Sequence, residues 1–258
     1  MKISCAAYSF RNALTRGKMT LEDFIRKGWE LGLDGVELTS YYFTTTEDEY
    51  VFKLKRVLLS YGLDVSAIGV GNRFTLPDVK AREKEVMKVK RWIEVAAKIG
   101  APVVRVFAGD VPEGYGEEEA FAWVVDALKE CVNYARRYGV VVALENHGGI
   151  TATAEGVLKI LRAVDSEWMG VNLDTGNYRL NRYEEIRKTA PYAVHVHAKF
   201  LKVGPEGNDE ILDYARIVDV LYKTGYKGYL SIEYEGKESA ESAVPRAVRF
   251  LKGLLKRT

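Results

Sequence analysis

The segment ALENHGG, residues 143–149, places three polar side chains directly after an apolar run. The valines at 140–142 are typical of a buried strand, and Glu145, Asn146 and His147 stand at its end. A carboxylate, an amide and an imidazole are costly to bury unless each finds a partner. We therefore expect a binding partner for them at the end of this strand.

Three further apolar segments carry polar side chains near their C-terminal ends. These residues are Asp174 in VNLDTGN, His195, His197 and Lys199 in HVHAKF, and Glu233 and Glu235 in SIEYE. Residues two apart on a strand point to the same face, so each of the last two sets lies on one face. All three histidines of the chain belong to this group of strand ends. A scatter of surface histidines would not produce that arrangement.

Four of these residues form a set that could bind one cation: Glu145, Asp174, His197 and Glu233. Three carboxylates that converge on one point repel each other unless a cation neutralises them. Oxygen ligands with one imidazole suit Mn²⁺ or Mg²⁺, with Co²⁺ or Zn²⁺ as alternatives. Taken singly, each residue has a simpler interpretation: a surface or helix-capping carboxylate, an Asx-turn, or a hydrogen-bonded core histidine. Their joint placement on four successive strands favours the metal site.

Strand-like and helical segments alternate along the whole chain. The eight strand candidates are residues 2–8, 34–38, 63–70, 102–109, 139–145, 168–174, 192–200 and 228–235. Between them, apolar residues recur at helical spacing, for example in 20–32, 79–100 and 117–139. Several helical segments end in glycine just before the next strand, which is a helix stop signal.

Alternating strands and helices imply a parallel sheet. Eight such units in 258 residues predict a single domain, residues 1–258, with the closed (β/α)8 TIM barrel fold. The rival is an open doubly wound sheet, which usually has a Gly-rich phosphate-binding turn after its first strand. The segment AAYSFRN, residues 6–12, contains no such turn. In a parallel barrel the active site lies at the C-terminal ends of the strands, where the candidate residues stand.

Composition argues against several classes of protein. The formal net charge is +2 with 29% charged residues, so nothing points to nucleic acid or to a membrane surface. Two cysteines are too few for a disulfide framework, which favours a reducing compartment. The N-terminal segment lacks the apolar stretch of a signal peptide, and no segment is long enough to span a bilayer. We expect a cytoplasmic protein, and the sequence does not decide whether it forms a homo-oligomer.

Seven short segments carry a resemblance to a known family. They are GVEL at 35–38, NRF at 72–74, VRVFAG at 104–109, LENHGG at 144–149, NLDTGN at 172–177, HVHAK at 195–199 and SIEYEG at 231–236. As an ordered set they resemble the xylose isomerase-like barrels of the sugar phosphate isomerase/epimerase group, over essentially the whole chain. That group includes ketose 3-epimerases, hydroxypyruvate isomerases, inosose dehydratases and, more distantly, endonuclease IV.

The resemblance implies that the four candidate ligands bind one divalent metal ion and that Glu145 and Glu233 also form the acid/base pair. Two positions depart from the family pattern. Asn177 stands where many members have a histidine, and Phe200 follows the strand lysine where an aspartate is frequent. Both departures leave the substrate open. With three histidines in all, the chain cannot supply the histidine-rich three-zinc cluster of endonuclease IV.

The implied chemistry is metal-dependent proton transfer on a small ketose or a related polyhydroxylated carbonyl compound. The metal ion would chelate a carbonyl oxygen and the neighbouring hydroxyl, which stabilises an enediolate. One of Glu145 and Glu233 would remove the α-proton and the other would return it, giving isomerisation or epimerisation. The expected substrate-binding residues are Asn72, Arg105, His147, Asn177, His195 and Lys199.

Alternatives remain open for some residues and for the function. Arg105 and Lys199 could anchor a carboxylate or phosphate, or could pair with a carboxylate of the barrel. Glu37 could orient a metal ligand, or pair with Arg105. A lyase of the inosose or dehydroshikimate dehydratase type would expel a β-hydroxyl from the same enolate. A non-catalytic sugar-binding barrel is the third hypothesis, and the complete glutamate pair argues against it because a binder needs no acid/base pair.

Overall fold

Eight parallel strands form the centre of the protein in the computed structural model, which describes residues 1–256. They are β1 (Lys2–Cys5), β2 (Gly35–Thr39), β3 (Asp64–Gly69), β4 (Val103–Val106), β5 (Val141–Glu145), β6 (Met169–Asp174), β7 (Ala193–Phe200) and β8 (Tyr229–Tyr234). They pair in the order β1-β8-β7-β6-β5-β4-β3-β2, and every pair is parallel. A parallel bridge between Ala6 and Glu37 links the two ends of this order, so the barrel is nearly closed. The (β/α)8 fold expected from the sequence is confirmed.

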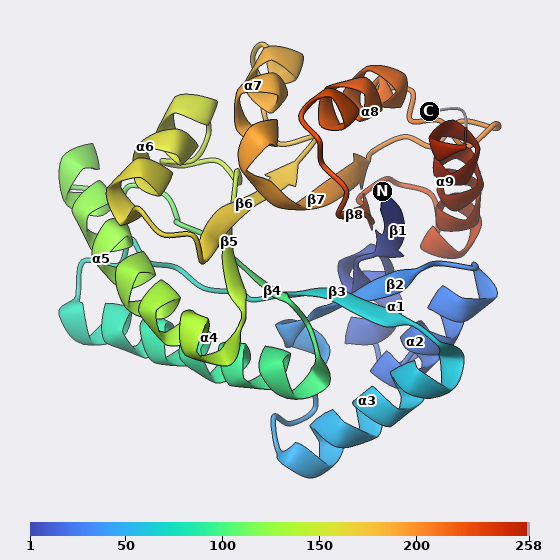
Figure 1. The fold of residues 1–258 in the computed structure, drawn as a ribbon, viewed down its shortest axis with the longest axis horizontal. Helices are drawn as coiled ribbons and strands as arrows, with labels where there is room; N and C mark the ends of the chain where they lie inside the picture. Colours follow the sequence, from blue (N-terminus) through green and yellow to red (C-terminus); the bar gives the residue numbers. More distant parts are fainter. Residues whose placement is uncertain (257–258) are drawn as a thin grey trace.

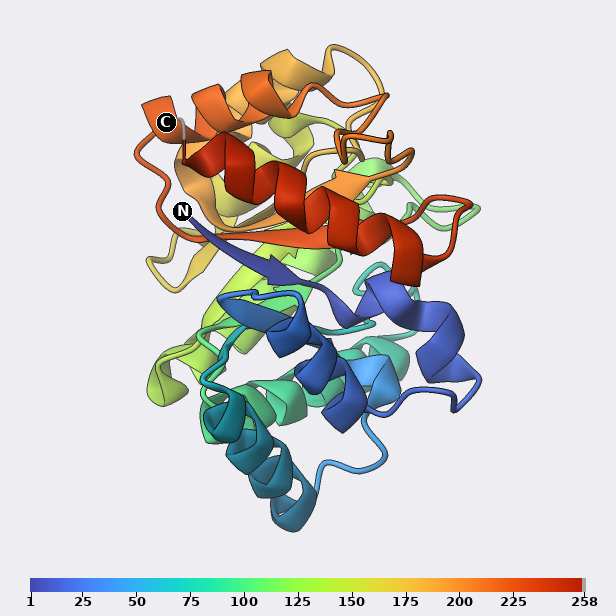
Figure 2. The same cartoon turned by 90° about the vertical axis from the view of Figure 1, so that its right-hand side faces the viewer.

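Helices surround this barrel. The α-helices of residues 1–256 are α1 (Arg11–Thr15), α2 (Leu21–Glu30), α3 (Asp48–Tyr61), α4 (Val79–Ile99), α5 (Glu117–Ala135), α6 (Ala154–Val164), α7 (Arg182–Thr189), α8 (Tyr214–Lys223) and α9 (Ala240–Leu255). Short 3-10 helices accompany them: η1 (Ala7–Phe10), η2 (Ser40–Tyr42), η3 (Arg136–Tyr138) and η4 (Ala190–Tyr192). Figure 1 shows the helices outside the strands, and Figure 2 shows α9, which packs against β1 and β8. In the part of the chain that the structure describes, no helix is both long and apolar enough to cross a lipid bilayer.

Local sequence explains where several helices begin and end. The side chain of Thr20 accepts a hydrogen bond from the backbone N–H of Asp23, and the Asp23 carboxylate accepts one from the backbone N–H of Thr20. This capping box starts α2. Gly62 and Gly100 follow α3 and α4 with φ of 63° and 96°. Glycine adopts this left-handed conformation without a steric penalty, and the predicted stop signals are confirmed at both positions.

The interior of the barrel changes from apolar to polar toward the C-terminal ends of the strands. Ala67, Val103 and Ala143 form a small apolar cluster separate from the main core between sheet and helices. Two residues further along their strands stand Arg105 and Glu145, which face the same way because side-chain direction repeats every second residue. The polar groups therefore lie on an apolar floor at the end where the sequence predicts the active site.

A shift in strand register sets the height of one candidate ligand. β6 and β7 are in register at Val171, but from Asn172 onward β7 runs one residue ahead. Such an irregularity adds a residue to one strand and re-aims the side chains that follow it. Asp174 consequently lies opposite His197 rather than Val196. The shift brings an aspartate and a histidine side by side on the inner face of the barrel.

Candidate active site

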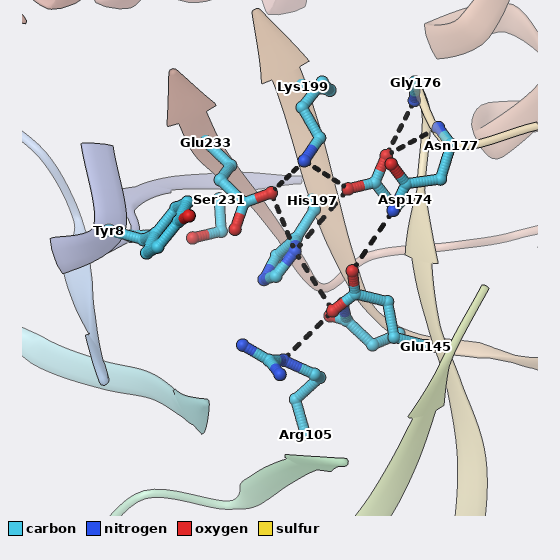
Figure 3. Close-up of polar contacts among 12 residues, drawn as sticks. Tyr8, Arg105, Glu145, Asp174, Gly176, Asn177, His197, Lys199, Ser231 and Glu233 are labelled. Atoms are coloured by element: carbon cyan, nitrogen blue, oxygen red, sulfur yellow. Dashed lines mark hydrogen bonds and ion pairs between the residues drawn. The ribbon is translucent and has the colours of Figure 1, made fainter. Parts of the chain in front are cut away.

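The four candidate ligands gather at one end of the barrel. Glu145 ends β5, Asp174 ends β6, and His197 and Glu233 lie near the ends of β7 and β8. Their exposed fractions are 1%, 0%, 0% and 5% in that order. Figure 3 shows all three carboxylates pointing toward His197, and Asp174 and Glu233 also pointing toward Lys199. The structure brings together the residues that the sequence singled out, while their chemical roles stay a prediction.

The imidazole of His197 stands between two sets of carboxylates. On one side its Nε2 lies 2.8 Å from Oε1 of Glu37 on β2. On the other side its Nδ1 lies 3.4 Å from Oε2 of Glu233, 3.6 Å from Oε2 of Glu145 and 3.9 Å from Oδ2 of Asp174. The Nδ1 atom therefore faces all three candidate carboxylates at once.

Glu145 is held by a buried cation and two amides. The Nε of Arg105 lies 3.0 Å from its Oε2. Asn172 donates a hydrogen bond to Oε2 at 3.2 Å, and Asn177 donates one to Oε1 at 3.3 Å. The sequence left the carboxylate partner of Arg105 open. In the structure Arg105 forms its ion pair with Glu145 and not with Glu37.

Asp174 uses its two oxygens differently. Oδ1 accepts hydrogen bonds from the backbone N–H groups of Gly176 and Asn177 at 2.8 and 3.0 Å, which is the turn-forming role that the sequence DTGN indicates. Oδ2 points into the site and lies 3.0 Å from Nζ of Lys199. One oxygen of Asp174 thus forms the turn and the other points into the site, where its role as a metal ligand stays a prediction.

The ammonium group of Lys199 lies among three carboxylates. It contacts Glu233, its neighbour across the β7–β8 pairing, as well as Asp174. It also lies 2.5 Å from Oε1 of Glu235. The ion-pair alternative for Lys199 therefore holds in this structure, and the ammonium neutralises part of the negative charge of the site.

Burial and neighbouring charges give Glu145 and Glu233 different pKa values. Burial raises the pKa of Glu145 to about 7, even though Arg105 and His197 act in the opposite direction. Burial would also raise the pKa of Glu233, but the charges of His197 and Lys199 outweigh it and hold that pKa well below its usual range. Two carboxylates whose pKa values are set apart are the pattern of an acid/base pair.

Two buried ligand atoms indicate where a cation would fit. Within residues 1–256, Oδ2 of Asp174 and Nδ1 of His197 are buried without a hydrogen-bond partner. Such atoms are rare in folded proteins, and these two form a compact group with Glu145, with ligand atoms within 4.8 Å of one another. A second compact group consists of Glu37, His195 and His197, but Nε2 of His197 is bonded to Glu37 and both ring nitrogens of His195 have oxygen partners. In the first group Nδ1 of His197 has no hydrogen-bond partner, and Oδ2 of Asp174 has the Lys199 ammonium as its ion-pair partner, so this group fits a divalent cation better than the second does.

The residues expected to bind substrate divide into two sets. His147 and Asn177 line a cavity of about 1200 Å³ beside the site, and Asn177 connects that cavity to Glu145. Asn72 is engaged elsewhere, because its amide donates to the carbonyl of Phe107 at 2.8 Å and accepts from the N–H of Phe107 at 2.9 Å. Asn72 therefore braces the segments that follow β3 and β4.

His195 lies deeper in the barrel. Its Nδ1 is 2.7 Å from Oδ1 of Asn172, its Nε2 is 3.3 Å from Oγ of Ser66, and the residue is 1% exposed. Because Asn172 in turn donates to Glu145, His195 helps to orient that carboxylate. Substrate contact by His195 would require one of its hydrogen bonds to break and stays a prediction.

Two buried polar residues of the site were not among those predicted from the sequence. Asn172 joins His195 to Glu145, and Ser231 donates to Oε2 of Glu37 at 2.6 Å. Each lies two residues before a candidate ligand on the same strand, so alternation alone places it on the inner face. A polar residue at an inward position of a strand is the sequence feature from which Asn172 and Ser231 could have been predicted.

The comparison with known families agrees with this geometry. A family model described as Xylose isomerase-like TIM barrel matches residues 25–254. The chain belongs to this family.

Three curated relatives differ in what their names state. An uncharacterised protein of Methanocaldococcus jannaschii is 30% identical over 173 residues, which are 60% of this chain and 58% of that protein. A C-glycoside deglycosidase alpha subunit of Arthrobacter globiformis is 45% identical over 58 residues, 22% of this chain and 16% of the subunit. The L-ribulose-5-phosphate 3-epimerase UlaE of Salmonella paratyphi A is 26% identical over 186 residues, 67% of this chain and 64% of the epimerase. This chain thus aligns with less than two thirds of the length of each.

Among solved structures, a D-tagatose 3-epimerase-like protein has a TM-score of 0.82 and 20% sequence identity, with 100% of this chain and 99% of that chain covered. At this identity the likeness shows the fold. The two relatives whose names state an activity are enzymes, in agreement with the expectation that this chain is an enzyme.

Proposed function

We propose that the protein is a divalent-metal-dependent sugar isomerase or epimerase acting on a small ketose or a related polyhydroxylated carbonyl compound. The observation that carries this proposal is the buried Nδ1 of His197, which has no hydrogen-bond partner and faces the carboxylates of Glu145, Glu233 and Asp174, with Oδ2 of Asp174 meeting the Lys199 ammonium. Mn²⁺ or Mg²⁺ suits this donor set best, with Co²⁺ or Zn²⁺ as alternatives. When bound, the cation supplies positive charge that polarises a substrate carbonyl.

Glu145 and Glu233 are the groups that would move the proton. They stand on different strands, and both approach Nδ1 of His197, at 3.6 and 3.4 Å. One carboxylate can remove a proton from the carbon next to the carbonyl, and the other can return a proton to the opposite face or to the neighbouring carbon. The handedness of the substrate decides which of them acts first.

The cavity beside the site has the chemistry of a sugar-binding pocket. It has a volume of about 1200 Å³, and His147, Asn177 and Asn181 line part of it. The ring of His147 packs on Phe107 with 4.3 Å between ring centres, which fixes the direction of its polar nitrogens. Amide and imidazole groups both donate and accept hydrogen bonds, as recognition of hydroxyl groups requires. The epimerase name of the Salmonella relative supports a sugar substrate.

A second candidate function starts with the same proton removal. The deglycosidase name of the Arthrobacter relative favours a lyase, in which the enolate expels a group from the next carbon instead of being reprotonated. Both functions need the two glutamates and the cation. They differ in the product, because isomers keep every atom of the substrate and elimination releases a fragment or water.

Deuterium exchange would test the proposal. The metal-stripped protein is loaded with Mn²⁺ and incubated in D₂O with a panel of ketoses, and the products are read by mass spectrometry and NMR. We expect deuterium at the carbon next to the carbonyl of at least one sugar, and no exchange when a chelator replaces Mn²⁺. Exchange that persists unchanged without metal, or a panel with no exchange at all, would contradict the proposal. The product separates isomerase, epimerase and lyase.

A further inference from the structure

One buried carboxylate of the barrel holds the candidate histidine ligand without belonging to the ligand set. Glu37 lies on β2 and is 1% exposed. Its two oxygens lie 2.8 and 3.1 Å from Nε2 of His197. On the far side of the same ring, Nδ1 faces the three carboxylates of Glu145, Asp174 and Glu233. The ring is therefore held between one carboxylate behind it and three in front.

The neighbours of Glu37 show that it is itself fixed in place. Ser231 donates a hydrogen bond to its Oε2 at 2.6 Å. Arg105, the other partner considered from the sequence, pairs with Glu145 instead. His195 approaches no closer than 3.8 Å and has its own hydrogen bonds. Both oxygens of Glu37 are thus directed toward His197, with a single hydroxyl group bracing one of them.

A neutral imidazole carries a proton on one nitrogen and a lone pair on the other. The proton stays on the nitrogen whose hydrogen bond is stronger, and a carboxylate is a strong acceptor. A carboxylate at Nε2 therefore keeps the proton there and leaves the lone pair on Nδ1, which is the atom that faces the candidate ligands. Histidine ligands commonly donate their second nitrogen to a carboxylate, which also makes the imidazole a better ligand.

We propose that Glu37 is the positioning residue that fixes the orientation and tautomer of His197, so that Nδ1 binds the cation. This inference rests on the proposed metal dependence. Glu37 itself touches neither the cation nor the substrate. Its effect is exerted through His197, and it should appear in metal affinity and in the protonation of that one ring.

The variants for the test are Glu37→Gln and Glu37→Leu, with Glu94→Gln as the matched control. Glutamine keeps the size of the side chain and one acceptor oxygen but loses the charge, whereas leucine removes the acceptor. Glu94 lies on α4, where its carboxylate accepts a hydrogen bond from the hydroxyl of Tyr134 at 2.5 Å. The control therefore removes one negative charge from a hydrogen-bonded carboxylate away from the barrel mouth.

Metal-stripped proteins are titrated with Mn²⁺ by calorimetry, and their thermal unfolding is recorded as a check of folding. We expect Glu37→Gln to weaken Mn²⁺ binding by about 10- to 100-fold, the range found when such supporting carboxylates are lost, and Glu37→Leu by more. Glu94→Gln should bind like the wild type. Folded Glu37 variants with wild-type affinity would refute the role of Glu37 while leaving the metal site intact. A wild type that binds no Mn²⁺ would refute the metal dependence itself.

A second measurement uses the wild type alone and so does not depend on whether a variant folds. The chain has three histidines, so a ¹⁵N-histidine-labelled sample contains only three imidazoles. In the wild type saturated with Zn²⁺, we expect His197 to carry its proton on Nε2 and to bind through Nδ1. Binding through Nε2, or a proton on Nδ1, would overturn the inference.

Discussion

In protein stripped of divalent metal, replacing Glu145 by glutamine should favour the folded state increasingly as the pH rises. Burial raises the pKa of this carboxyl from 4.5 to about 7. A group whose pKa is higher in the folded than in the unfolded state gives a stability contribution that is fully present below its unfolded pKa. That contribution is lost as the pH rises through the folded pKa. Above about pH 7 the wild type therefore carries a buried, ionised carboxylate that the variant lacks.

The two pKa values give the size of the effect. Each pH unit between the folded and the unfolded pKa corresponds to about 1.4 kcal/mol. The interval from 4.5 to about 7 therefore corresponds to about 3 kcal/mol of unfolding free energy, nearly all of it lost between about pH 4.5 and 8.5. Glutamine has the shape of a protonated glutamic acid and meets the same neighbours, Arg105, Asn172 and Asn177. Over this range the free energy of unfolding of the variant should therefore rise by about 3 kcal/mol relative to that of the wild type.

Urea unfolding of both proteins in the presence of a chelator, at several pH values, measures this difference. The change with pH reports residue 145 together with the shift that its charge causes in the neighbouring Asp174, His197 and Glu233. With saturating Mn²⁺ the wild type should instead be more stable than the variant, because the wild type gains binding energy that the variant loses. A difference that stays constant within about 0.5 kcal/mol from acid to alkaline pH would show that Glu145 is not the desolvated carboxyl described above.

Further substitutions separate the roles within the site. At saturating Mn²⁺, Glu145→Gln and Glu233→Gln should each lose at least about a hundredfold in turnover on the best ketose, because an amide cannot accept the α-proton; near-normal turnover would leave that residue as a ligand only. His197→Ala should lose Mn²⁺ binding, whereas His195→Ala should keep it and bind substrate more weakly, and calorimetry showing the reverse would place the wrong histidine at the metal. Lys199→Met should bind Mn²⁺ more tightly, because the ammonium that contacts Asp174 and Glu233 is gone; an unchanged or weaker affinity would mean that the ammonium does not compete with the cation.

The alternation of strand and helix segments was enough to predict the barrel, and the polar residues at the strand ends were enough to predict which side chains meet in it. Glu145 lies at the end of a valine strand, and Glu233 shares its face with Glu235. In a parallel barrel such ends must converge, and they do. These are local properties of the sequence, which is why they could be predicted without the pairing of distant strands.

Features that depend on long-range pairing could not be predicted in the same way. The register shift that puts His197 opposite Asp174 depends on how β7 meets β6, and no residue at the shift marks it in the sequence. Glu37 was left with two possible partners, a metal ligand or Arg105, and only the pairing of strands 160 residues apart places it at His197. The two hydrogen bonds between the Asn72 amide and the backbone of Phe107 also depend on how the segments after β3 and β4 meet, and substrate contact by Asn72 stays a prediction.

Locating Mn²⁺ in crystals of the protein by anomalous scattering tests the central claim most directly. We expect one strong peak at the C-terminal end of the barrel. It should lie about 2.0–2.3 Å from a carboxylate oxygen of each of Glu145, Asp174 and Glu233 and from Nδ1 of His197. A peak bound by other residues, or a peak at this end that lacks two or more of these four ligands, would contradict the claim.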